Sequence, residues 1–192
     1  MKVFQIGFNK CGTTSLCSFF NRNGHKAVHW DKGKWQNIVK TNLAEGKLLL
    51  EGLEFIKFFS DMTSIQYNYK TLAVQYPESK FIYNVRNLDN WLVSKSTHTP
   101  NWLNPYVRGD KEYFNLYGYE IPRREYWRTH WLIHRQAIED YFVGVLSKRL
   151  LIFDIEKDTG DKIANFLPEL RFHDLNFPHL KKTQDPNNKE LT

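Results

Sequence analysis

A short apolar run followed by a turn with two glycines lies near the start of the chain. Residues 3–16 read VFQIGFNKCGTTSL. The run at 3–8 is typical of a buried strand, and residues 13–21 carry helical signals. Gly7 and Gly12 have the spacing of the G-x-x-x-x-G-K-[ST] loop, in which backbone amides and a helix N-terminus bind phosphate oxygens. The stretch therefore predicts a strand, a phosphate-binding loop and a helix.

One residue departs from the nucleoside-triphosphate form of this loop. Thr13 stands where the lysine that reaches the β- and γ-phosphates is expected, and the only lysine of the loop is Lys10. The exchange argues against ordinary magnesium-ATP chemistry, although a P-loop nucleotide or small-molecule kinase stays an alternative. The structural alternative is a glycine-containing turn in which residues 13–15 only cap a helix.

The rest of the chain alternates between strand and helix patterns. Further strands are predicted at residues 26–30, 54–59, 80–85 and 150–155, and helices at 32–45, 64–75, 89–96 and 158–167. This alternation predicts an α/β fold, a single P-loop-type domain over 1–180 with about five mainly parallel strands and helices on both faces. Ligands of such a sheet bind at the carboxyl ends of its strands.

Two segments break the pattern. Residues 98–124 are rich in tryptophan, tyrosine, proline and glycine, and we expect an insertion that forms a lid over the cleft or packs as secondary core. Apolar residues from Trp127 to Val145 then recur at three- and four-residue steps, which predicts one long helix. The polar tail at 181–192 is expected to be flexible.

Composition and charge limit the function further. The 192 residues are 41% hydrophobic and 25% charged, which is the balance of a globular domain. The net charge of +6 favours anionic ligands. We expect a cytoplasmic protein with neither membrane insertion nor a disulfide, because no apolar segment is long enough to span a membrane or to form a signal-peptide core, and because the only cysteines are Cys11 and Cys17. The basic residues are dispersed, so a nucleic-acid partner is not expected, and the oligomeric state stays open.

The loop resembles that of the PAPS-dependent sulfotransferases, whose first strand leads into K-x-G-T-T-[ST]-L. Residues 10–16 here read KCGTTSL. The resemblance implies that the loop binds the 5′-phosphosulfate of 3′-phosphoadenosine 5′-phosphosulfate (PAPS) with Lys10 near the bridging oxygen. PAPS would be the co-substrate and 3′-phosphoadenosine 5′-phosphate (PAP) the product, and no metal is expected. The loop residues implied are Asn9, Lys10, Cys11, Gly12, Thr13, Thr14 and Ser15.

A second motif follows the strand at 80–85. Arg86 ends this strand and Ser94 lies eight residues later, about two turns into the next helix. Taken alone, Arg86 equally suits an ion pair with a carboxylate. In the sulfotransferases, however, an R-[ND]-x-x-x-x-x-x-S pattern binds the 3′-phosphate, which is the role implied for Arg86 and Ser94. The family's R-x-x-G-x-x-G-D-W-K element is not evident, so Lys181 and Lys182 are only suggestions for further contacts.

Sulfuryl transfer to a hydroxyl, or alternatively to an amine, needs a base for the acceptor's proton. Asp61 is the first candidate because it follows the strand at 54–59 beside the loop, although an aspartate there equally caps the next helix. His98 is the second candidate. The remaining alternatives are His29, Glu54 and Glu51.

Two other patterns of cysteine and histidine do not fit a metal site. The spacing of Cys11, Cys17, His25 and His29 fits no common zinc finger. His130 and His134 lack the glutamate of a metalloprotease helix, so core packing or a structural hydrogen bond is the better interpretation.

The acceptor is predicted only as a small molecule or a glycan. The aromatic segment would suit a sugar ring, an aromatic alcohol or an anionic glycan, the last held by Arg108, Arg123 or Arg124. A non-catalytic anion- or nucleic-acid-binding module is a further alternative.

Overall fold

The fold is built on a five-stranded parallel sheet. The computed structural model describes residues 1–98 and 123–180. The strands are β1 (Val3–Gln5), β2 (Ala27–Val28), β3 (Phe58–Phe59), β4 (Lys80–Val85) and β5 (Leu150–Asp154), in the order β2-β3-β1-β4-β5. All four pairings are parallel. The predicted single α/β domain with a five-stranded sheet is therefore confirmed.

Aromatic side chains alternate between the two faces of the sheet. Phe4 pairs with Phe59 and Phe81 on the neighbouring strands, and its ring centroid lies 5.6 and 5.4 Å from theirs. Val3, its register partner Phe58 and Ile82 of β4 belong to a separate core cluster. Successive side chains of a strand point to opposite faces, so residues of this kind bury both faces and require helices on each.

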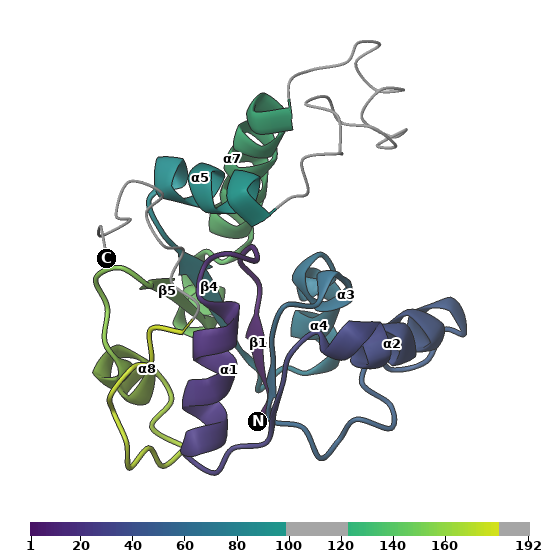
Figure 1. Ribbon diagram of the computed structural model, residues 1–192. Coiled ribbons are helices and arrows are strands. Elements are labelled where there is room, and N and C mark those ends of the chain that lie inside the picture. The colour runs from purple at the N-terminus through teal and green to yellow at the C-terminus, as the bar shows by residue number, and fades with distance from the viewer. Residues whose placement is uncertain (99–122, 181–192) are drawn as a thin grey trace.

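Helices cover the sheet on both sides (Figure 1). One face packs against α1 (Thr13–Arg22) and α8 (Gly160–Phe166), which contribute residues such as Leu16 and Ile163. The other face packs against α2 (Lys34–Ala44), α3 (Thr63–Gln66), α4 (Tyr69–Gln75) and the C-terminal part of α7 (Arg123–Tyr141). Two 3₁₀ helices, η1 (Asp31–Gly33) and η2 (Gly144–Arg149), precede α2 and β5.

The helix predicted at 64–75 is interrupted. It forms the two helices α3 and α4, with Asn68 between them. The Asn68 amide donates to the Ser64 carbonyl at 2.9 Å, which offers that carbonyl a side-chain donor. The long helix also ends earlier than predicted, at Tyr141, because the backbone is extended at Val143 and has a positive φ of 56° at Gly144. Val145 is consequently exposed rather than part of the apolar face.

The segment predicted as an insertion, residues 98–124, overlaps a helix at each of its ends. His98 is the last residue of α5 (Leu88–His98), and Arg123 and Arg124 begin α7. The remaining residues, 99–122, and the predicted tail at 181–192 lie outside the described residues.

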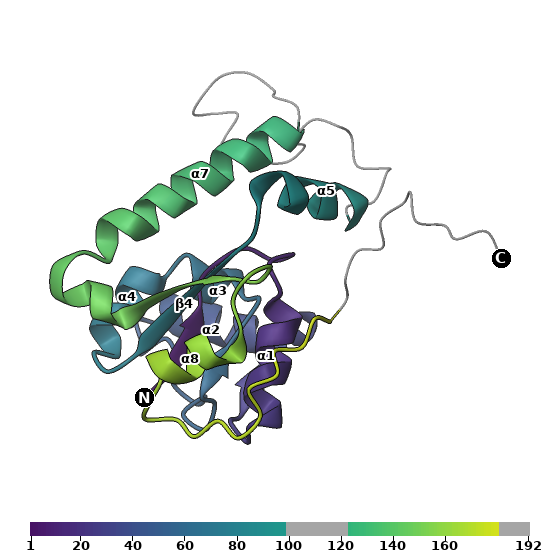
Figure 2. The same ribbon diagram turned by 90° about the vertical axis from the view of Figure 1, so that its left-hand side faces the viewer.

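Helices α5 and α7 lie together beyond the carboxyl end of β4 (Figure 2). Trp91 of α5 and Trp131 of α7 are buried against each other and against Phe8, with ring centroids 4.7 to 5.5 Å apart. Phe8 belongs to the loop that follows β1. This aromatic cluster therefore fixes both helices against the loop.

The loop is held from below by the buried side chain of Asn84 on β4. Its Oδ1 accepts hydrogen bonds from the Gly7 N–H at 3.1 Å and from the Gln5 amide at 2.6 Å. Its Nδ2 donates to the carbonyls of Cys11 at 2.6 Å and Phe8 at 3.4 Å. One side chain thus partners backbone groups at both ends of the loop.

Gly7 lies so close to Asn84 that no side chain fits. A Cβ at this position would come within 2.3 Å of both the Asn84 carbonyl oxygen and its Oδ1. We expect Gly7→Ala to lower the free energy of unfolding by at least about 3 kcal/mol, because the methyl group must displace the polar support of the loop. Gly24→Ala is the control, since its backbone is left-handed but nothing lies within 4 Å. It should cost only about 1–2 kcal/mol. Urea denaturation of both variants measures the difference, and equal losses would contradict the assigned contact.

Candidate active site

The loop after β1 presents backbone groups at the start of α1. Lys10 and Gly12 both have positive φ, of 64° and 72°. Gly12 is the N-cap of α1, no side chain caps this helix, and its first turn contains no acidic residue. Backbone amides at such a terminus favour an anion. A Cβ at Gly12 would lie 3.0 Å from the Ile155 side chain, so the loop also packs against the end of β5.

A second buried amide connects the loop to β3. The Gln5 Oε1 accepts from the Asp61 N–H at 2.7 Å and from the Ser60 hydroxyl at 3.3 Å, while that hydroxyl lies 3.1 Å from the Thr13 carbonyl. Asp61 has a positive φ of 56°. The hydrogen bond to Gln5 helps to hold this left-handed conformation, which a non-glycine residue adopts at a cost. The alternative that Asp61 caps the next helix is wrong, because the N-cap of α3 is Met62. Asp61 is connected to Gln5 through its backbone N–H.

Each strand ends in a residue of the site. His29 follows β2, Asp61 follows β3, Arg86 follows β4 and Glu156 follows β5, while the loop itself follows β1. All strands are parallel, so these residues meet at one edge of the sheet.

Asp61 and His29 contact each other beside the loop. Their Oδ2 and Nε2 atoms are 3.3 Å apart, and the same His29 nitrogen lies 3.1 Å from the Thr13 hydroxyl. Both side chains are about a quarter exposed, at 25% for Asp61 and 29% for His29. The carboxylate is thus tied to the loop through one imidazole and still reaches solvent.

Arg86 is paired with Glu156. The two form an ion pair at 2.9 Å, and the guanidinium also donates to the Lys10 carbonyl at 3.2 Å. Glu156 accepts from the Asn87 N–H and the Asn90 amide as well. Burial alone would raise the pKa of Glu156, but hydrogen bonds from Asn87, Arg86 and Asn90 outweigh it, and the net pKa is lowered.

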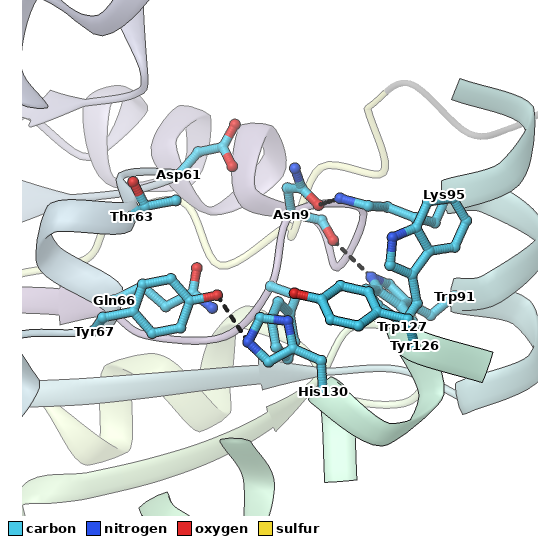
Figure 3. A pocket seen from close by; sticks show the side chains of 11 residues that line it. Asn9, Asp61, Thr63, Gln66, Tyr67, Trp91, Lys95, Tyr126, Trp127 and His130 are labelled. Atoms are coloured by element: carbon cyan, nitrogen blue, oxygen red, sulfur yellow. Dashed lines mark hydrogen bonds between the residues drawn. The ribbon is translucent and has the colours of Figure 1, made fainter. Parts of the chain in front are cut away.

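A pocket of about 200 Å³ opens next to the loop (Figure 3). Its lining comes from the loop, from the segment after β3 and from α3, α5 and α7. The lining residues are Phe8, Asn9, Asp61, Thr63, Gln66, Tyr67, Trp91, Lys95, Tyr126, Trp127 and His130. Asn9 belongs to both the loop and the pocket, so the two sites are continuous.

Lys95 brings a second positive charge to this junction. Its ammonium donates to Asn9 Oδ1 at 3.0 Å and lies 5.8 Å from the centre of the Trp127 ring. Burial lowers the pKa of Lys95, nearby Asp61 opposes this shift and Lys10 adds to it. The loop lysine, Lys95 and the Asp61 carboxylate therefore share one electrostatic environment.

The two histidines of α7 have different surroundings. His134 is buried and its Nε2 lies 2.7 Å from the Ile6 carbonyl, so the predicted structural hydrogen bond is confirmed. Burial lowers the pKa of His134, which favours the neutral ring. His130 instead lines the pocket, with its ring stacked on Tyr67 at 5.9 Å between centroids.

The remaining residues that the sequence predicts for the site have different surroundings. Ser15 accepts a hydrogen bond from the Leu180 N–H at 3.0 Å, and Ser94 is buried on α5. Cys11 is buried, and burial raises the pKa of its thiol, which favours the uncharged form. Glu51 and Glu54 lie in the segment before β3, away from the loop edge. The side chains of His98, Arg108 and Arg123 lie outside the described structure.

Sequence reasoning missed most of the pocket wall. Lys95, Trp91 and Gln66 lie on helices whose patterns predict only core or solvent positions. The one sequence signal for this wall is the position of Lys95, which directly follows Ser94 on the helix after Arg86.

Comparison with known proteins agrees with this geometry. A family model described as a sulfotransferase domain matches residues 2–185, which is nearly the whole chain. The chain belongs to this sulfotransferase family. Comparison with curated proteins gives no match. Among solved structures, the deoxyadenosine kinase of M. mycoides with bound dATP matches with a TM-score of 0.40 and 14% identity, covering 88% of this chain and 98% of that chain.

The described part of this sulfotransferase shows neither a cluster of metal-binding side chains nor a membrane-spanning helix. Within residues 1–98 and 123–180, no three or more His, Cys, Asp or Glu residues cluster as ligands for a metal ion. Over the same part of the chain, each helix is too short or too polar to cross a membrane.

The lowered pKa of Glu156 makes stability depend on pH. The group has a pKa below 4.5 when folded, so its stabilising effect is present above pH 4.5 and is lost as the pH falls through the folded value. The stability difference between the wild type and Glu156→Gln should therefore be largest near neutral pH and shrink in acid. Glu139→Gln is the control, because it removes another Arg–Glu ion pair on the surface of α7. Chemical denaturation from pH 3 to 7 measures this, and a constant difference for Glu156→Gln would contradict the assigned contacts.

Proposed function

We propose that this sulfotransferase moves a sulfuryl group from PAPS to an acceptor hydroxyl. The observation that carries the proposal is the continuity of the loop with the pocket, because Asn9 belongs to both. Asp61 also lines the pocket, and its N–H is bonded to Gln5, which supports the loop. The sulfuryl donor, bound at the loop, and the acceptor, bound in the pocket, would therefore lie next to each other.

The loop would hold the 5′-phosphosulfate of the donor. The uncapped start of α1 and the side chains of Lys10, Thr13 and Thr14 supply positive potential and hydrogen bonds for an anion. Arg86 and Ser94 are assigned to the 3′-phosphate. Arg86 already contacts the Lys10 carbonyl, so a phosphate bound there would sit beside the loop.

Asp61 is the base in this proposal. The acceptor oxygen attacks sulfur, the bond from sulfur to the bridging phosphate oxygen breaks, and the hydroxyl proton passes to the Asp61 carboxylate. The leaving PAP keeps the electron pair on its phosphate oxygen, where Lys10 stabilises the developing charge. His29 fixes the carboxylate by its contact at 3.3 Å, and it does not line the pocket. His98 is the alternative base, as it ends the helix that carries Lys95.

Ligand-dependent stability is the first test of the donor. PAP at 100 times its dissociation constant should stabilise the fold by about 2.7 kcal/mol. The measurement is the thermal transition with PAP, with ATP and magnesium, and with a single-stranded RNA at matched concentration. A shift with ATP and magnesium alone would support a kinase, and a salt-sensitive shift with RNA alone would support a binding module.

Arg86 should contribute to donor affinity. We expect Arg86→Ala to weaken PAP binding by about 2–3 kcal/mol, because a charge-assisted hydrogen bond to phosphate is lost. Arg128→Ala is the matched control, since Arg128 also forms a 2.9 Å ion pair, with Asp89. Calorimetric titration of PAP into both variants measures the effect. Equal affinities in the two variants would remove Arg86 from the donor site.

Turnover should separate the roles of Asp61 and Lys10. Lys10→Ala is expected to lose about 10²- to 10³-fold in kcat, as when one preorganised donor is removed. Asp61→Asn should lose about 10²- to 10⁴-fold in kcat with PAP affinity retained, because only the proton acceptor is removed. Lys40→Ala and Asp140→Asn, which change exposed residues of α2 and α7, are the controls. Full activity of either site variant would exclude that residue from the reaction.

A further inference from the structure

The pocket has a polar side and an aromatic side. Figure 3 shows Asp61, Thr63, Asn9 and Lys95 along the side next to the loop, and Tyr67, His130 and Tyr126 along the opposite side, with Trp127 between them next to Lys95. A ligand with one polar end and one apolar ring matches this division. Its hydroxyl would lie toward Asp61 and the loop.

The aromatic side offers flat faces. Tyr67 and His130 are nearly parallel, with 6° between their planes, and the Tyr67 hydroxyl and His130 Nε2 are bonded to each other at 3.3 Å. The indole N–H of Trp91 donates to the Asn9 carbonyl at 2.8 Å, so the polar atom of this side chain is already paired. A sugar ring carries hydroxyl groups around its rim, and burying these against such a wall without partners is unfavourable.

The volume suits a ligand of one ring with small substituents. The described residues line a space of about 200 Å³. An apolar cavity of about 150 Å³ is enough to bind benzene, so a substituted benzene fits this pocket.

One buried hydrogen-bond donor in the wall lacks an acceptor. Gln66 lines the pocket and is only 6% exposed, and its Nε2 finds no hydrogen-bond partner among residues 1–98 and 123–180. An unpaired buried donor costs free energy. This nitrogen is covered by its neighbours, but the terminal torsion of a glutamine is broad, and rotation of the amide would bring its N–H to an acceptor atom on a ligand. Gln66 lies on α3, across the pocket from Lys95.

Resting on the function proposed above, we propose that the acceptor is a single-ring aromatic alcohol, with its hydroxyl toward Asp61 and a hydrogen-bond-accepting substituent toward the Gln66 amide. Gln66 is then a specificity-determining residue. The aromatic residues bind the ring face to face, and the amide selects what the ring carries.

Direct binding tests the acceptor class without turnover. The probes are hydroxyacetophenones, isopropylphenols of the same shape without the carbonyl, acetylcyclohexanols with a saturated ring, and methyl glucoside. Each is titrated by calorimetry with and without PAP, using the ortho, meta and para isomers of the substituted compounds. The hydroxyacetophenones should bind more tightly than the saturated alcohols and the glucoside. Preference for the glucoside, or no binding of any phenol, would overturn the proposed class.

Variants of Gln66 test its role. In Gln66→Leu and the more similar Gln66→Met, the affinity ratio of hydroxyacetophenone to isopropylphenol should fall about fivefold, which corresponds to one hydrogen bond of about 1 kcal/mol. Both variants should fold, because they remove an unpaired buried donor. Gln136→Leu changes an exposed glutamine of α7 and should leave the ratio unchanged. A ratio that stays constant at every ring position in both Gln66 variants would overturn the assignment.

The aromatic wall is tested in parallel through Trp127. Trp127→Ala should weaken phenol binding about 2- to 10-fold, and Trp127→Phe should restore most of it, as expected for a ring contact. Equal affinities in both variants would contradict the stacking.

The same titrations separate the two proposals. PAP binding without phenol binding would leave the proposed sulfotransfer in place and overturn the acceptor class. Phenol binding without PAP binding would support the pocket assignment and contradict the PAPS-dependent function.

Discussion

The site depends on a buried polar network beneath the phosphate loop. Gln5, Ser60 and Asn84 are almost completely excluded from solvent, and they connect the ends of β1, β3 and β4 through side-chain hydrogen bonds. Buried amides are stable only when their donors and acceptors are paired, and here the backbone of the loop supplies most of the partners. The loop and the three central strands therefore specify one another. A loop of this shape needs Gly7 at its start, because Asn84 occupies the space of a side chain.

Parallel strands turn this local arrangement into a complete site. Every strand ends at the same edge, so His29, Asp61, Arg86 and Glu156 meet although they are far apart in the sequence. The helices α5 and α7 then extend the edge into a pocket, since Trp91 and Trp131 fix them against Phe8 of the loop. The loop and the pocket thus share one rigid support, and one wall of the pocket is built from the same aromatic cluster that packs against the loop.

The sequence predicts the sheet, the loop and the residues at the strand ends because these follow from local patterns. Apolar runs mark buried strands, two glycines mark the loop, and residues directly after a strand fall at one edge of a parallel sheet. The pocket wall follows from no such pattern. Lys95 and Gln66 reach the cavity only through the packing of α5 and α3, and the break at Asn68 that places Tyr67 beside His130 depends on a side-chain hydrogen bond. Local patterns leave open whether Arg86 pairs with a carboxylate, because its partner Glu156 lies 70 residues away.

The pairing of Arg86 with Glu156 has a consequence for how the edge discriminates among anions. The guanidinium is already neutralised by a carboxylate that two further hydrogen bonds, from the Asn87 N–H and the Asn90 amide, hold in place. A singly charged anion offers Arg86 no more charge than Glu156 does, so exchanging one for the other yields little electrostatic gain. A phosphate monoester with nearly two charges does offer more. In the proposed donor site the pair would therefore act as a charge filter, which favours a terminal phosphate over monovalent anions.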